Sequence, residues 1–159
     1  MKHLPKHIRP RWRYLAVELE TWPDADLSRG SFQRELWFAA QNFVGDAGSA
    51  DADLTVLDFH FSGCVGETVV RARRGYVSEA RAALACIDEI SGHSVGIRVR
   101  GVSGTVRACE ERYLRRPAGV PEERSVVFAD SDRTALARDT VLDVRLSSGF
   151  VGATELDFE

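Results

Sequence analysis

The residues best suited to chemistry in this chain are arginines beside a glycine-bracketed turn, within residues 95–114. Apolar residues alternate with Arg98 and Arg100, which predicts a strand with one apolar face and one basic face. The turn follows, and then a helix that Ser103 or Thr105 can cap. Guanidinium groups, free N–H groups and a helix N-terminus therefore meet at one corner, an arrangement that favours phosphate binding.

The sequence has two further groups of cations, the first of them with aromatic residues nearby. One group lies in the first 13 residues beside Trp12 and Tyr14, and the other comprises Arg71, Arg73 and Arg74. Basic side chains interleaved with aromatic rings are typical of RNA binding through phosphate contacts and base stacking. Other interpretations stay open. The strand arginines can pair with Glu67, Asp58 or Glu18 on neighbouring strands, helix arginines can pair with Glu111, and the rings can pack under a helix.

Signatures of an active site are missing from the sequence. It contains no G-x-x-x-x-G-K-[ST] phosphate loop, and Thr105 stands where the pattern G-x-S-x-G needs its last glycine. The 4 histidines have no metal-ligand spacing, and the acidic loop over 45–53 lacks the calcium-loop pattern. We therefore expect no catalytic residue and no metal site.

Length and cysteine content favour a single core in the cytoplasm. A chain of 159 residues suffices for one domain. Its 3 cysteines are scattered and form no disulfide or C-x-x-C pattern, which suits a reducing compartment. No apolar run reaches the length of a membrane span, and the N-terminus lacks the apolar segment of a secretory signal. We therefore expect a cytoplasmic protein with no membrane partner.

Charge is unevenly distributed along the chain. Residues 1–116 hold 17 of the 21 basic and 15 of the 24 acidic residues, a net +2, whereas residues 117–159 carry a net −5. Only 2 of the basic residues are lysine, and this bias resembles proteins adapted to a salt-rich cytoplasm. Because salt weakens phosphate binding, an RNA-binding protein there should rely on shape and on bidentate arginine geometry.

Periodicity predicts the order strand, helix, strand, strand, helix, strand, helix before residue 116. Phe32, Leu36, Ala39 or Ala40 and Phe43 should form the buried stripe of the first helix, and Leu57, Phe59 and Phe61 should share one face of the second strand. The strands are expected over 11–20, 54–61, 65–74 and 95–100, and the helices over 31–44, 77–89 and 106–114.

This order predicts an α/β (α+β) sandwich of the ferredoxin-like or RRM-like βαββαβ type. Right-handed crossovers close such a chain into a four-stranded antiparallel sheet with two helices on one face. The other face is left for the extra helix, a partner or RNA. A fold of this type serves many unrelated functions, so it does not decide the function.

Three segments are expected along the chain. Residues 1–11 form an extended basic arm, residues 12–116 the core, and residues 117–159 an acidic C-terminal extension. Within the extension, strands over 125–128 and 140–146 should flank a short helix over 131–138. Apolar residues alternate in the last of these strands, so we expect the extension to pack on the core.

Several stretches of the core resemble one protein family. The sequence RGVSGTVRACEERYL over 100–114 is similar to a signature of archaeal and eukaryotic ribonuclease P protein component 2. RWRYLAVEL over 11–19 resembles the first strand of that family. VVRARR over 69–74 and YVSEARAAL over 76–84 resemble its third strand and second helix. The resemblance covers residues 5–116 and leaves the acidic extension unmatched.

The resemblance implies a non-catalytic subunit of ribonuclease P, the ribonucleoprotein that removes the 5′ leader of precursor tRNA. The RNA subunit with Mg²⁺ would be the catalyst, so this chain would bind no cofactor itself. Its partners would be the ribonuclease P RNA, protein component 3, other protein subunits and, in the holoenzyme, precursor tRNA. A homodimer within a heterotetramer is one arrangement. The family signature often has Lys at the position of Arg112.

On this interpretation, the candidate RNA-contact residues lie in the arm, in two strands, in the turn and in the last helix. They are Lys6, Arg9, Arg11, Arg13, Tyr14, Arg71, Arg73, Arg74, Arg98, Arg100, Ser103, Gly104, Thr105, Arg107 and Arg112. Two other classes of protein stay open. One is a ferredoxin-like module that binds a small regulatory molecule in an apolar pocket between subunits, and the other is a protein-interaction module whose open sheet face binds a partner.

Overall fold

The computed structural model describes residues 3–114 and 121–158, and the chain divides into two compact units, Met1–Arg116 and Pro117–Glu159. The first two residues of the predicted arm and the predicted boundary at residues 116 and 117 lie outside the described residues. Among the described helices, none is long and apolar enough to cross a membrane.

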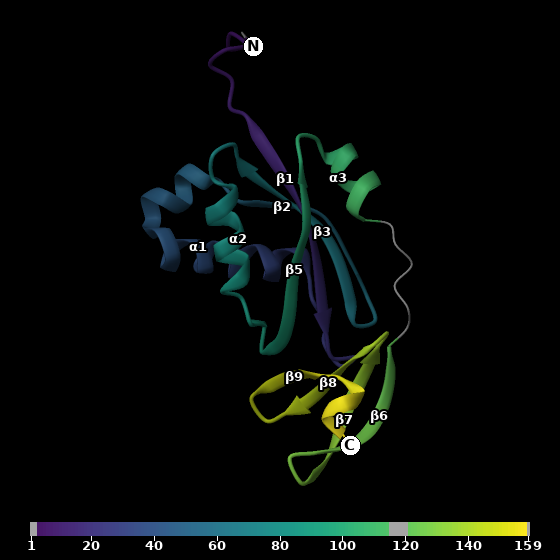
Figure 1. Ribbon diagram of the computed structural model, residues 1–159. Coiled ribbons are helices and arrows are strands. Elements are labelled where there is room, and N and C mark those ends of the chain that lie inside the picture. The colour runs from purple at the N-terminus through teal and green to yellow at the C-terminus, as the bar shows by residue number, and fades with distance from the viewer. Residues whose placement is uncertain (1–2, 115–120, 159) are drawn as a thin grey trace. The chain divides into compact units, whose positions relative to one another are not determined.

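The first unit is built on one antiparallel sheet with strand order β2-β3-β1-β5-β4. Figure 1 shows α1 and α2 on one side of this sheet. The strands are β1 (Trp12–Thr21), β2 (Thr55–Ser62), β3 (Val65–Arg73), β4 (Glu89–Ile90) and β5 (His93–Ser103), and the helices are α1 (Arg29–Ala52), α2 (Val77–Ala85) and α3 (Val106–Tyr113). Without the two-residue β4, this is the predicted four-stranded ferredoxin-like sheet.

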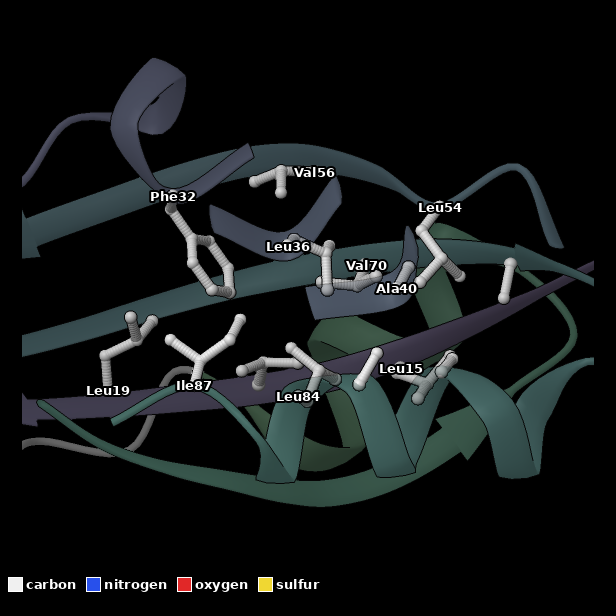
Figure 2. Close-up of a cluster of buried hydrophobic side chains, with 14 of the residues drawn as sticks. Leu15, Leu19, Phe32, Leu36, Ala40, Leu54, Val56, Val70, Leu84 and Ile87 are labelled. Carbon is white, nitrogen blue, oxygen red and sulfur yellow. The ribbon is translucent and has the colours of Figure 1, made fainter. Parts of the chain in front are cut away.

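The main core lies between the sheet and the helices α1 and α2 (Figure 2). Leu15, Val17 and Leu19 alternate along β1 and are fully buried, while Phe32 and Leu36 meet them from α1. Strand β1 is buried on both of its faces, and the buried residues of the second face include the charged Glu18. Ala16 is also buried on this second face, where it packs with Val69 and with Cys109 of α3. The sheet is therefore covered by α1 and α2 on one face and by α3 on part of the other.

Helix α1 is longer than the sequence predicts. It begins after the N-cap Ser28, which forms a capping box with Ser31. It then continues through the predicted acidic loop to Ala52, with a kink at Gly45, where φ is +76°. Phe43 does not join the buried stripe as predicted, because its side chain lies beyond the core and is 52% exposed.

The predicted face of β2 is wrong because the strand contains a bulge. Asp58 has a left-handed backbone conformation, with φ of +34°, and the pairing of β2 with β3 shifts register between Leu57 and His60. A bulge moves the following side chains to the other face. Leu57 therefore packs on the α3 side, whereas Phe59 packs on the α1 side.

Helix α2 is shorter than predicted. It ends at Ala85 with Cys86 as its C-cap, so the predicted last turn is instead an irregular segment that leads into β4. Ile87 is buried as its spacing predicts, although it lies outside the helix. Strand β5 is longer than predicted and takes in most of the expected turn, and Thr105 caps α3 by accepting a hydrogen bond from the Ala108 N–H at 3.2 Å.

The second unit is an antiparallel meander with strand order β6-β7-β8-β9. The prediction of a helix over 131–138 is wrong, because this segment is a strand in a pair of hairpins. Ala129, Asp130 and Asp139 have positive φ and form the turns at its two ends. The elements are β6 (Glu122–Phe128), β7 (Ser131–Arg138), β8 (Val141–Leu146), β9 (Gly149–Ala153) and the 3-10 helix η1 (Glu155–Phe158).

A small core of its own holds the second unit together. Ala135, Leu142 and Val144 are buried on one face of the meander, where Phe128 and Phe158 pack against them. Packing of this extension on the first unit stays a prediction.

Candidate nucleic-acid interface

Three side chains form what we call the Trp12 cluster: Trp12, Arg71 and Arg73. Trp12 lies opposite Arg73 in the pairing of β1 with β3, and Tyr14 lies opposite Arg71. The guanidinium carbon of Arg71 lies 4.0 Å from the centroid of the Trp12 ring, and that of Arg73 lies 5.5 Å from it. Both distances allow a cation–π attraction. The register of two strands thus gathers two of the predicted contact residues around one indole ring.

Arg71 is held in place by more than the ring. Its Nη2 donates a hydrogen bond of 3.3 Å to the Thr55 hydroxyl on β2, and the residue is half-buried. Arg73 and Arg74, by contrast, are exposed at the end of β3. The cluster therefore presents one fixed guanidinium and one exposed guanidinium beside a half-buried indole.

The N-terminal arm starts from the same end of the sheet. The Arg74 N–H donates a hydrogen bond to the Arg11 carbonyl at 2.8 Å, which ties the base of the arm to β3. The arm is not extended throughout as predicted. It forms a turn in which the Ile8 N–H bonds the Pro5 carbonyl at 3.0 Å, and Arg9 bonds the Leu4 carbonyl. The predicted contact residues Lys6, Arg9 and Arg11 are all exposed.

The predicted turn also lies at this end. Ser103 is the last residue of β5 and pairs with Tyr14, and Thr105 is the N-cap of α3. The guanidinium of Arg13 lies beside Gly104, 3.4 Å from the position that a Cβ would occupy there. The structure thus brings the turn, Arg13 and Tyr14 close to the Trp12 cluster in the sheet.

Arg107 and Arg112 on α3 are weaker candidates for RNA contacts than the arginines of the Trp12 cluster. Arg107 pairs with Glu111 one turn later, at 2.8 Å, and its side chain is 87% exposed. Exposed pairs of this kind are worth roughly 0.3–0.5 kcal/mol, so Arg107 can exchange its partner at little cost. Arg112 is also exposed, with its guanidinium carbon 5.9 Å from the Tyr113 ring centroid.

Arg98 and Arg100 belong to a different group, which we call the Glu18 cluster: Glu18, Arg98 and Arg100. Glu18 is buried and pairs with Arg98 at 3.2 Å and also with Arg100. Arg100 is the extra residue of a bulge, since Ala16 pairs with Gly101 and the next residue of β1 pairs with Val99. Both arginines reach the same carboxylate across this irregular stretch of the pairing. The cross-strand pairing with Glu18 that the sequence left open is present.

Helix α3 separates the two clusters. Ala16 lies between Tyr14 and Glu18 on β1, and it is covered by Cys109 and Tyr113 of α3. The strand arginines share one face of the sheet, as the sequence allows, but they form two groups rather than one basic surface. The Glu18 cluster contains a carboxylate that offsets its guanidinium charge, so the positive end of the face is the end that carries the Trp12 cluster.

Some residues of this arrangement escaped sequence reasoning. The sequence indicates Trp12 for stacking without placing it among the candidate RNA-contact residues, and it gives no indication of Thr55. The signal for Trp12 was present, because it shares a strand face with Tyr14 and faces the alternating arginines of β3. Thr55 could not be found without the register of β2 with β3.

Burial, with a smaller effect of the Glu110 carboxylate, raises the pKa of the Cys109 thiol to about 11. Within the described ranges, no three His, Cys, Asp or Glu side chains lie close enough to hold a metal ion.

The first unit is an α+β sandwich whose sheet has a basic, aromatic end, and this fold defines the class of the protein. Comparison with known proteins then shows its family. Residues 13–114 match the model of the Rpp14/Pop5 family. The chain belongs to the Rpp14/Pop5 family.

Relatives named ribonuclease P protein component 2 match the chain at full length. The protein from Halorubrum lacusprofundi is 58% identical over 159 residues, which is 100% of each chain. The protein from Natronomonas pharaonis is 62% identical over 157 residues, 99% of this chain and 98% of that one. These similarities confirm the family resemblance, and halophilic relatives support the predicted salt-adapted source.

A more distant relative of the same name matches a smaller part of the chain. The protein from Methanosarcina barkeri is 32% identical over 124 residues, 78% of this chain and 87% of that one. The family model also stops before the second unit. The acidic meander therefore lies outside the shared family core, although the two halophilic relatives match over its length.

Proposed function

We propose that this chain is a non-catalytic protein subunit of ribonuclease P, which removes the 5′ leader of precursor tRNA in the cytoplasm. The observation that carries the proposal is the full-length similarity to proteins named ribonuclease P protein component 2. In this role the RNA subunit with Mg²⁺ performs the hydrolysis, and the protein supports the fold of the RNA.

The basic end of the sheet supports RNA binding. Arg11 and Arg74 are exposed there, each next in sequence to a residue of the Trp12 cluster, and Lys6 and Arg9 are exposed on the arm that starts from this end. Cations held at fixed positions lower the repulsion between phosphates of RNA helices that pack together. We assign this end to the RNA. Arg98 and Arg100 stay candidate contacts. Because both pair with Glu18, an RNA phosphate would have to compete with this carboxylate for them.

Protein partners complete the proposal. The chain would act together with protein component 3 and further protein subunits, with a homodimer inside a heterotetramer as one arrangement. Around Glu18, the carboxylates of Glu18 and Glu20 balance the guanidinium groups of Arg98 and Arg100, so this part of the face is better suited to a protein than to RNA.

The test is cleavage of precursor tRNA by the cognate ribonuclease P RNA at low Mg²⁺. The RNA is assayed alone, with this chain, with component 3, and with both proteins. We expect cleavage to be stimulated most when both proteins are present, because each braces RNA that Mg²⁺ alone leaves unfolded. Absence of stimulation, with the protein folded and the salt matched to its host, would contradict the proposal and favour the regulatory-module alternative.

A further inference from the structure

We propose that the Trp12 cluster is a stacking site for an unpaired nucleobase of the RNA, and that this contact keeps RNA binding strong at high salt. The inference rests on the proposed function, since it assumes that RNA meets this end of the sheet. It goes further by assigning the base and the phosphate contacts to different side chains.

The geometry of Arg71 supports a stacking site. Its guanidinium carbon lies 4.0 Å from the Trp12 ring centroid, which is stacking distance, and Thr55 holds the group from the β2 side. Its Nε is buried and lacks a hydrogen-bond partner among the described residues. A guanidinium fixed in this way has little rotational freedom left to lose when a base stacks on the cluster.

The exposure of the other two members leaves room for a ligand. Trp12 is half-buried and Arg73 is exposed, at 5.5 Å from the ring centroid. Trp12 is thus less covered than the core indole of Trp22, which is 7% exposed. Flat π-systems at the solvent boundary of a basic strand end are the feature by which proteins stack unpaired bases, largely without sequence preference.

Salt explains why a stack would be useful here. Each phosphate contact releases counterions, so its contribution to affinity falls steeply as salt rises, whereas stacking on a ring releases none. The halophilic relatives and the scarcity of lysine indicate a salt-rich setting for this chain. A base held on Trp12 would therefore supply affinity that salt does not remove.

The experiment measures the affinity of the complex of this chain and component 3 for ribonuclease P RNA over a series of KCl concentrations. Four variants are compared with the unmodified chain: Trp12→Leu, Trp12→Phe, Arg74→Ala and Phe38→Leu. Phe38 is an exposed aromatic residue of α1 and serves as the control for loss of an aromatic ring. Circular dichroism establishes that each variant is folded.

We expect Trp12→Leu to weaken binding about 10- to 100-fold at every salt concentration, without changing the slope of log K against log salt. Trp12→Phe should retain most of the affinity. Arg74→Ala should instead make the slope shallower by roughly 0.7–0.9, because one phosphate contact is lost. Phe38→Leu should match the unmodified chain. If Trp12→Leu does not fold, Arg71→Lys replaces it, since that variant keeps the charge and removes the stacked plane.

Two results would overturn the inference. One is unchanged affinity of a folded Trp12→Leu chain. The other is a shallower slope for Trp12→Leu, which would mean that the ring only positions phosphate-binding arginines. Failure of the proposed function looks different, because the unmodified chain with component 3 would then not bind the RNA at any salt concentration.

Discussion

The ring of Tyr113 lies so close to Gly101 that a Cβ at residue 101 would overlap it. Gly101 is a buried strand residue of β5, and Tyr113 is the last residue of α3. The sequence pattern suggests that this glycine serves a turn, but its role is to let an aromatic ring reach the sheet. It thereby fixes the position of α3 over Ala16 and Val69.

Gly101→Ala should lower the free energy of unfolding by about 1–3 kcal/mol, because the added methyl group displaces the Tyr113 ring. Gly96→Ala is the matched control, since Gly96 lies on the same strand and a Cβ there would have only ordinary contacts, the nearest at 3.9 Å. Urea unfolding of both variants measures the difference. Equal stability of the two variants would show that α3 does not depend on this contact.

Glu18→Gln should destabilise the protein by about 1–3 kcal/mol, because a buried carboxylate shared by Arg98 and Arg100 is lost. The control is Glu20→Gln. Glu20 lies 4.0 Å from Arg98 and its side chain is 35% exposed, so we expect a loss below about 0.5 kcal/mol. Thermal unfolding at fixed salt distinguishes the two. If Glu20→Gln cost as much as Glu18→Gln, the shared buried carboxylate would not be the source of the stability.

The double variant Arg73→Ala/Arg74→Ala should lower the stimulation of precursor-tRNA cleavage while the protein stays folded. Its control removes the same charge elsewhere: Arg34→Ala/Arg81→Ala changes two exposed arginines of α1 and α2. Cleavage at low Mg²⁺ is the readout, because phosphate repulsion is greatest there. Equal loss in both double variants would mean that total charge, rather than this end of the sheet, determines the effect.

Stability should fall with rising pH above pH 9.0 in a way that depends on Cys109. Its pKa is raised to about 11 in the folded protein, so the folded state keeps a proton that the unfolded chain releases. Between these two pKa values, Cys109 should lower the free energy of unfolding by at most about 1.4 kcal/mol per pH unit. Above the folded pKa this slope should vanish, and the stability already lost should not return. The difference in unfolding free energy between the native chain and Cys109→Ala measures it. Parallel curves against pH for the two proteins would contradict the shift.

Local patterns were enough to predict the order of elements in the first unit, apart from the two-residue β4, and most of its main core. Alternation in β1 and helical spacing in α1 each report which side chains are buried, and Thr105 was one of two predicted caps. The bulges at Asp58 and Arg100 could not be predicted, because a bulge is defined by the pairing of two strands that are distant in sequence.

In the second unit, local sequence preference predicts the wrong element. Segment 131–138 contains Ala, Leu and Arg, which are strong helix formers, yet it folds as β7. Strand neighbours on both sides supply hydrogen bonds that outweigh this intrinsic preference. The Trp12 cluster also depends on pairing between strands that are distant in sequence. Only the register of β1 with β3 brings Arg71 onto the ring.

The position of α3 makes the two ends of this sheet face energetically independent. Trp12 and Glu18 are six residues apart on β1, about 20 Å along an extended strand, and packed α3 side chains lie between them. Substitutions so far apart, without shared partners, have additive effects. Selection could therefore alter the binding partner at one end without disturbing the other, which makes a single small sheet two separately evolvable surfaces.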